Sequence, residues 1–118
     1  MKCIAIDDEP VALSVLRQYC QRIGEVDLKT YSDPVVGMQE VKRLKPDLLF
    51  LDIRMGEVSG VELAREIPQG TFLVFTTAYA QYAVDGFDLN AVDFLHKPFS
   101  FGRFCQAFEK AQQLRTLR

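Results

Sequence analysis

The sequence predicts a single three-layer α/β domain, in which a parallel sheet of five strands lies between two layers of helices. Five short apolar segments recur along the 118 residues, and each is followed by a stretch whose apolar residues have helical spacing. Several segments are almost continuously apolar, which is typical of strands covered on both faces. No long linker or internal repeat divides the chain. Right-handed crossovers between the five strand–helix units would therefore place helices on both faces of one sheet.

The first strand–helix unit begins with the strand candidate KCIAI, residues 2–6. Apolar side chains then recur at spacings of three and four, which predicts one buried helix face. These side chains are Leu13, Leu16, Cys20 and Ile23. Gly24 follows and can end the helix, because glycine readily adopts the backbone conformation found at helix C-termini.

The second unit begins with VDLKTY, residues 26–31. Asp33 followed by Pro34 is typical of a helix N-cap with proline at the first helical position. The core face of this helix is marked by Met38, Val41 and Leu44. Pro46 follows and ends the helix, since proline cannot continue it.

The third unit begins with DLLFLD, residues 47–52. Ser59 can cap a short helix that we expect to run through Ile67, where Pro68 and Gly70 close it. The fourth unit consists of the strand TFLVFTT (71–77) and a helix over roughly 80–88. The fifth unit consists of the strand VDFLH (92–96) and a final helix. The core face of this helix is formed by Phe101, Phe104, Cys105, Phe108 and Ala111.

Composition and charge exclude several classes of protein. A formal charge of −2 argues against a nucleic-acid surface on this domain, which would normally be basic. The three cysteines, Cys3, Cys20 and Cys105, form no Cys-x-x-Cys pair, so a zinc site or disulfide framework is not expected. The apolar start is interrupted at Asp7, and no segment is long enough to span a membrane. We expect a cytoplasmic protein with reduced thiols.

Polar residues gather where the predicted strands end. They are Asp7 and Asp8 after the first strand, Asp52 after the third, Thr76 and Thr77 after the fourth, and Lys97 after the fifth. In a parallel sheet these ends meet at one edge, where ligands bind in folds of this class. Three carboxylates at one edge need a counter-charge, and Mg²⁺ prefers such oxygen ligands.

One of these carboxylates could act as a nucleophile toward a phosphoryl group. Asp52 is favoured, because it ends the middle strand and heads the loop DIRMGEVSG that opens the site. The ammonium of Lys97 and a threonine hydroxyl could then stabilise the transferred oxygens. Acids are also common at helix N-termini for structural reasons, and we assign Glu9, next to Pro10, to that role.

From residue 2 to about residue 112, the sequence resembles the receiver domains of bacterial two-component response regulators. The matching motifs are IAIDDEP, DLLFLDIRM, VFTTA and DFLHKPF, in this order. The segment TTAYAQYAVDGFDLNAVDFLHKPFSFGRF is most similar to receivers linked to LytTR-type DNA-binding domains. The resemblance implies a flavodoxin-like (βα)5 fold with the strand order 2-1-3-4-5.

The resemblance also implies roles for the residues at the strand ends. Asp52 would accept a phosphoryl group from a sensor histidine kinase. Asp7, Asp8, Asp52 and the backbone carbonyl of Arg54 would bind Mg²⁺. All four residues lie in the motifs IAIDDEP and DLLFLDIRM, which match the family position by position.

Further roles follow from the two C-terminal motifs. Thr77, directly before alanine, matches the switch hydroxyl, with Thr76 as the second candidate. Lys97 would pair with the acids at rest and with the phosphoryl group after transfer, next to a cis peptide bond at Pro98. Phe94 occupies the position of the aromatic switch residue. The lone histidine, His96, has no role in this scheme and is interpreted as an ordinary strand-end residue.

Two features vary on the family pattern. Gly56 stands where such loops often have proline, and we expect it to loosen the loop and change phosphorylation or dephosphorylation rates. Arg54 and Tyr79 lie two residues beyond Asp52 and Thr77, respectively. Side chains there flank the path of an attacking water, so this large pair is predicted to slow hydrolysis of the phosphoryl group.

The resemblance therefore predicts a signalling switch that catalyses only its own phosphorylation and dephosphorylation. Residues 1–118 would form the receiver, which would dimerise through the face made by helix four, strand five and helix five. DNA would be bound only through an output domain outside this sequence, and no membrane partner is expected. Two alternatives stay open: an unphosphorylated protein-binding scaffold and, less favoured, an aspartyl phosphatase. Arg54 replaces the second aspartate that haloacid dehalogenase-type phosphatases require, and the nucleotide-binding motifs GxGxxG and P-loop are absent.

Overall fold

A five-stranded parallel sheet forms the centre of the computed structural model, which describes residues 1–79 and 90–117. The strand order is β2-β1-β3-β6-β7. The strands are β1 (Lys2–Ile6), β2 (Asp27–Tyr31), β3 (Leu48–Asp52), β6 (Phe72–Thr77) and β7 (Asp93–His96). In order of appearance these five strands have the arrangement 2-1-3-4-5, so the predicted fold and strand order are confirmed, and each predicted strand agrees with the structure to within one residue.

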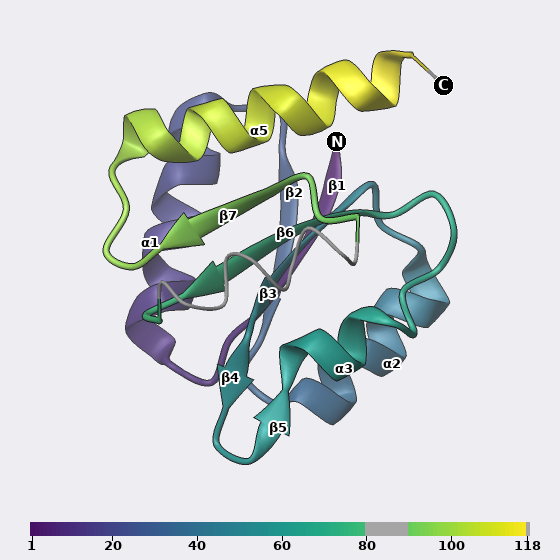
Figure 1. Ribbon diagram of the computed structural model, residues 1–118. Helices are drawn as coiled ribbons and strands as arrows, with labels where there is room; N and C mark the ends of the chain where they lie inside the picture. Colours follow the sequence, from purple (N-terminus) through teal and green to yellow (C-terminus); the bar gives the residue numbers. More distant parts are fainter. Residues whose placement is uncertain (80–89, 118) are drawn as a thin grey trace.

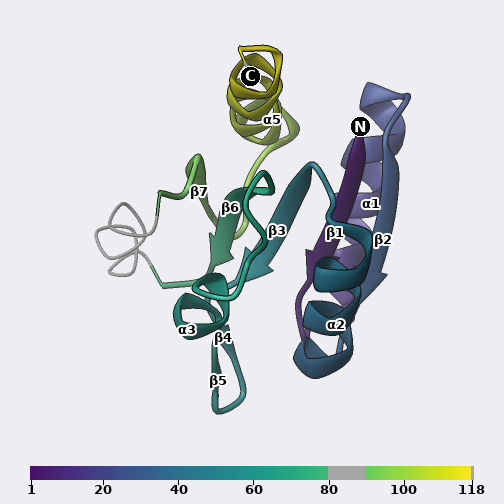
Figure 2. The same ribbon diagram turned by 90° about the vertical axis from the view of Figure 1, so that its right-hand side faces the viewer.

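Helices cover both faces of the sheet (Figures 1 and 2). They are α1 (Pro10–Ile23), α2 (Pro34–Leu44), α3 (Gly60–Ala64) and α5 (Phe101–Thr116). One core lies under α1 and α5, and it includes Leu16, Phe50 and Phe104. The other lies under α2 and α3, and it includes Val41 and Phe75. Every residue of the central strand β3 is buried, which explains its continuous apolar sequence.

Local sequence signals set the starts of the helices. Pro10 and Pro34 occupy first-turn positions, where a missing N–H has no cost. The Asp33 carboxylate accepts hydrogen bonds from the N–H groups of Val35 and Val36 and so caps α2. The Ser100 hydroxyl caps α5 in the same way. These caps confirm the predicted start of α2 and position the loops that precede the helices.

One local prediction was wrong, and a second one, on Gly56, is not tested by the structure. Ser59 does cap α3, but the helix ends at Ala64 rather than Ile67, and residues 65–66 form a turn. That Gly56 loosens its loop stays a prediction, and the structure shows the conformation of this glycine. It has a φ of +59° in the tight connection between two short antiparallel strands, β4 (Arg54–Met55) and β5 (Val58–Ser59). Glycine accepts this left-handed conformation without a side-chain clash, so it permits the hairpin.

The helix predicted over residues 80–88 lies outside the described residues. Within the described ranges, 1–79 and 90–117, no helix is both long and apolar enough to cross a bilayer. The three cysteines are free thiols. Burial raises the pKa of Cys3 to about 12 and that of Cys20 to about 11, so both remain protonated and pack as small apolar side chains.

Candidate functional site

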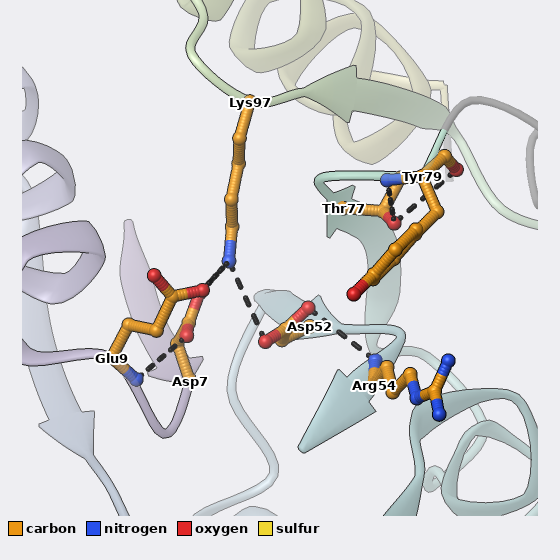
Figure 3. Close-up of polar contacts among 7 residues, drawn as sticks. All are labelled: Asp7, Glu9, Asp52, Arg54, Thr77, Tyr79 and Lys97. Carbon is orange, nitrogen blue, oxygen red and sulfur yellow. Dashed lines mark hydrogen bonds and ion pairs between the residues drawn. The ribbon is translucent and has the colours of Figure 1, made fainter. Parts of the chain in front are cut away.

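The carboxyl edge of the sheet brings together the charged residues that the sequence placed at the strand ends (Figure 3). Asp7 directly follows β1, Asp52 ends β3, and Lys97 directly follows β7. The parallel register pairs Ile6 with Leu51 and Asp52 with Thr76, so these ends lie level with one another. A buried acid–lysine cluster is the result.

Lys97 is the cation of this cluster. Its ammonium nitrogen lies 2.7 Å from Oδ2 of Asp7, 3.5 Å from Oδ2 of Asp52 and 3.3 Å from Oε1 of Glu9, and its side chain is only 14% exposed. Burial by itself would lower the pKa of Lys97, but the neighbouring carboxylates outweigh it, and the pKa is raised. The lysine therefore stays charged and compensates the buried acids.

Asp52 is an acid whose protonation depends strongly on this environment. Burial, followed by the charge of Asp7, raises its pKa to about 7, although Lys97 acts in the opposite direction. One carboxylate oxygen also accepts a hydrogen bond of 3.4 Å from the backbone N–H of Arg54. Without a further cation, the charged form of Asp52 is thus disfavoured near neutral pH.

The acidic cluster has the chemistry of a site for a hard divalent cation. Carboxylate oxygens of Asp7, Asp8, Glu9 and Asp52 all lie within 4.8 Å of one another. Oδ2 of Asp7 is buried, and its close polar neighbour among the described residues is the ammonium of Lys97 at 2.7 Å. Asp8 is exposed and offers an accessible ligand at the rim. Oxygen ligands in this number, partly buried and partly open to water, suit Mg²⁺.

Glu9 has a role that the sequence analysis missed. It occupies the N-cap of α1, but its side chain makes no capping hydrogen bond there. Its carboxylate instead contacts Lys97, while its backbone N–H donates to Oδ1 of Asp7 at 3.0 Å. The Glu9–Lys97 contact joins residues 88 positions apart, so no local pattern could have indicated it.

Thr77 and Phe94 lie toward the helix layer of α2 and α3. Phe75 and Phe94 belong to that core and stack with ring centroids 5.2 Å apart. Because side chains alternate along β6, Thr77 shares the side of Phe75, whereas Thr76 shares the side of Val74 in the α1–α5 core. The hydroxyl of Thr77 accepts a hydrogen bond of 2.9 Å from the backbone N–H of Tyr79.

Two large side chains stand over the Asp52 edge. The guanidinium carbon of Arg54 lies 5.7 Å from the centre of the Tyr79 ring, a cation–π arrangement, and both residues are exposed. The peptide bond between Lys97 and Pro98 is cis. His96 is exposed at the end of β7 and belongs to no ion pair of the described residues.

A second residue missed at the sequence level is Gly60, the first residue of α3. A Cβ atom at this position would lie 2.1 Å from the carbonyl oxygen of Asp52. The backbone N–H of Gly60 donates to the carbonyl of Ile53 at 2.6 Å. The absence of a side chain therefore lets α3 begin directly against the backbone of the acid, a long-range requirement that a lone glycine in the sequence does not reveal.

Comparison with known proteins points to one family. The model of a family described as response regulator receiver domain matches residues 3–109. Sensory transduction protein LytT of Enterococcus faecalis is 38% identical over 117 residues, which cover 96% of this chain and 48% of that protein. The chain thus spans about half the length of the curated relatives it matches.

Solved structures agree with this result. The response regulatory domain of protein mrkE from Klebsiella pneumoniae is 27% identical and matches with a TM-score of 0.89 over 100% of both chains. Response regulator TrrA from Thermotoga maritima, solved in complex with Mg²⁺-BeF, is 26% identical. It matches with a TM-score of 0.83, covering 93% of this chain and 97% of that one.

Proposed function

This chain belongs to the response regulator receiver domain family, and from this premise we propose that Asp52 is its phosphoacceptor. Members of this family are phosphorylation-dependent signalling switches rather than enzymes. One observation carries the proposal: Asp52 is a buried carboxylate at the carboxyl edge of the sheet, 3.5 Å from the ammonium of the half-buried Lys97 and within a cluster of acids. A sensor histidine kinase is the class of partner that serves this family.

The proposed reaction is an in-line displacement at phosphorus. An oxygen of the Asp52 carboxylate forms a bond to phosphorus as the bond to the donor imidazole nitrogen breaks, and the electron pair of that bond stays on the imidazole. Lys97 is close enough to neutralise one of the transferred oxygens. Mg²⁺, held by Asp7, Asp8, Asp52 and the carbonyl of Arg54, would neutralise the others.

Thr77 and Phe94 are proposed as the residues that change conformation on phosphorylation. The hydroxyl of Thr77 would leave the backbone of Tyr79 and donate to the phosphoryl group, and Phe94 would move into the space left behind. Their common position on one side of β6 and β7 supports this coupling. The changed surface would lie on β7 and α5, together with the helix four that the sequence predicts, and would serve dimerisation.

The whole protein is proposed to be a cytoplasmic transcription regulator. LytT relatives are about twice as long as this chain, which supports an output domain of LytTR type beyond the receiver. DNA would be contacted through that domain only. An unphosphorylated scaffold is less well supported, because every residue type that the chemistry needs is present at the site.

The direct test is incubation with acetyl phosphate and Mg²⁺, followed by intact-mass measurement. We expect a gain of one phosphoryl group in the wild type and none in Asp52→Asn. Omitting Mg²⁺ should reduce the modified fraction strongly. A wild-type protein that stays unmodified would contradict the proposal and favour the scaffold, whereas steady hydrolysis of p-nitrophenyl phosphate would favour the phosphatase.

A further inference from the structure

The loop that carries Lys97, residues 97–100, is fixed to three separate elements. The backbone N–H of Lys97 donates to the carbonyl of Thr77 at 2.7 Å, which attaches the loop to β6. The hydroxyl of Ser100 caps α5. The third contact comes from α1: the hydroxyl of Tyr19 donates a hydrogen bond of 2.9 Å to the carbonyl oxygen of Phe99. Tyr19 and Phe99 are 80 residues apart in the sequence.

Aromatic packing reinforces this third contact. The ring of Tyr19 lies 6.0 Å from that of Phe99 and 5.4 Å from those of Phe101 and Phe104, centroid to centroid. The guanidinium of Arg22, also on α1, lies 3.8 Å from the centre of the Phe101 ring. The start of α5 and the loop before it are therefore packed against one face of α1.

The same helix also begins close to Asp7, the acid partner of Lys97. Helix α1 begins at Pro10, only three residues after Asp7. The nine residue-to-residue steps from Pro10 to Tyr19 correspond to about 14 Å of continuous helix. One hydrogen-bonded helix thus begins beside the acid loop and contacts the lysine loop further along, so it connects the two loops that carry Asp7 and Lys97.

We propose that Tyr19 is a positioning residue for Lys97, whose hydroxyl, by binding the carbonyl of Phe99, holds the lysine loop in register with the acidic cluster. The inference rests on the proposed function, because it assigns Lys97 to the phosphoryl group. Tyr19 touches none of the reacting groups and acts only through the loop. The ring contributes packing, but the hydroxyl sets the position of the backbone two residues from Lys97.

Tyr19→Phe tests the hydroxyl by itself, since the variant keeps the aromatic packing. The chain contains no tryptophan, so binding would be followed by calorimetry. We expect beryllofluoride, measured with saturating Mg²⁺, to bind about three- to tenfold more weakly, the effect of losing one hydrogen bond. The initial rate of phosphorylation by acetyl phosphate should fall by a similar factor. Binding of Mg²⁺ by itself should change less than binding of beryllofluoride, because the proposed Mg²⁺ ligands lie outside the loop and feel it only through the charge of Lys97.

Val41→Ala is the matched control for a general loss of stability, because Val41 is buried in the opposite core under α2. It should lower the melting temperature without weakening beryllofluoride binding. The proposal is overturned if Tyr19→Phe binds beryllofluoride as well as the wild type, or if Val41→Ala weakens it equally.

A readout that is independent of phosphorylation separates this inference from the proposed function. The side-chain ammonium resonance of Lys97, assigned by its loss in Lys97→Met, should shift in Tyr19→Phe and stay in place in Val41→Ala. If the wild type accepts no phosphoryl group, the proposed function fails, and this resonance decides about Tyr19. An unchanged resonance in Tyr19→Phe then refutes the positioning role.

Discussion

At the scale of single residues, the raised pKa of Asp52 has a consequence for stability. The pKa is about 7 in the folded protein, against an ordinary value of 3.8. At pH values between these two pKa values, the folded state binds more protons than the unfolded state. The contribution of Asp52 to stability is therefore complete below pH 4 and is lost as the pH rises through 7. The charged acid thus destabilises the metal-free receiver at alkaline pH.

Asp52→Asn should therefore stabilise the metal-free protein, and more so at pH 8 than at pH 5. The expected gain at pH 8 is on the order of 2 kcal/mol, or roughly 5–10 °C in melting temperature. Thermal unfolding of both proteins in EDTA at pH 5 and pH 8 measures this gain. Mg²⁺ should raise the melting temperature of the wild type more at pH 8 than at pH 6, because protons compete for the same carboxylate. Equal stability of the two proteins at pH 8 would refute the pKa argument.

Arg54 and Tyr79 are expected to control the lifetime of the phosphorylated state. The two exposed side chains lie beside Asp52 (Figure 3), and the path of an attacking water is expected to pass them. The double variant Arg54→Ala, Tyr79→Ala should shorten the half-life of the phosphoryl group severalfold, as followed by intact mass after removal of the donor. Arg65→Ala, an exposed arginine at the end of α3, serves as the control. An unchanged half-life in the double variant would contradict the prediction that Arg54 and Tyr79 slow hydrolysis.

At the scale of elements, the approach of α3 to β3 depends on one missing side chain. Gly60→Ala would place a Cβ atom 2.1 Å from the carbonyl oxygen of Asp52, and that backbone can move away only by displacing Asp52, the proposed phosphoacceptor. We expect a loss of about 1–3 kcal/mol in the free energy of unfolding, together with slower phosphorylation. Chemical denaturation measures the first effect.

Gly102→Ala is the matched control for this substitution. It lies on α5, where the added Cβ would meet only the Ser100 hydroxyl at 3.9 Å. The exchange should be neutral or stabilise by about 0.5–1 kcal/mol, since alanine is the better helix former. Equal losses in both variants would mean that the close approach at Gly60 is unimportant.

The contact between α5 and β7 depends on an ion cluster around Asp93. Arg103 donates two hydrogen bonds to its carboxylate, at 2.7 and 2.8 Å, and one to the carbonyl of Phe94, while Lys110 contacts it at 3.2 Å. Burial would raise the pKa of Asp93, but these donors outweigh it and lower the pKa. The cluster therefore stabilises the fold above pH 4, and its contribution is lost as the pH falls through the lowered pKa.

Arg103→Gln should cost about 1–3 kcal/mol at pH 7, because it leaves a buried carboxylate with fewer partners. Arg115→Gln is the control: its ion pair with Asp47 is more exposed, and its loss should cost little. Unfolding by urea at pH 7 and pH 3 compares them, and the difference should shrink at pH 3. If Arg103→Gln loses no more stability than Arg115→Gln at pH 7, the cluster does not stabilise the packing of α5 against β7.

At the scale of the whole molecule, the site and the α5 face should act as one switch. Phe94 stacks on Phe75 next to the site, and its carbonyl accepts a hydrogen bond from Arg103 of α5. Beryllofluoride with Mg²⁺ should therefore promote dimerisation, seen as a shift in sedimentation coefficient. The shift should be absent in Asp52→Asn. An unchanged profile of the wild type at saturating ligand would count against coupling between the site and this face.

The sequence by itself determined the features that depend on neighbours along the chain. Apolar runs and helical spacing predicted five strands and the helices between them, and Asp33 with Pro34 predicted the start of α2. The positions of Asp7, Asp52, Thr77 and Lys97 at strand ends predicted one shared edge, because parallel strands end together. Such signals are local, so a reader of the sequence can recognise them without the fold.

Only the tertiary structure decided the features that depend on contacts between distant segments. Glu9 was predicted to serve the helix start, but the fold brings Lys97 within reach of its carboxylate. The hydrogen bond from Tyr19 to Phe99 likewise exists only because α1 packs beside α5. The end of α3 and the hairpin at Gly56 depend on how the chain turns back after Asp52. Burial and the distances between charges arise only when the chain is folded, and they set the pKa of Asp52 and the partners of Lys97.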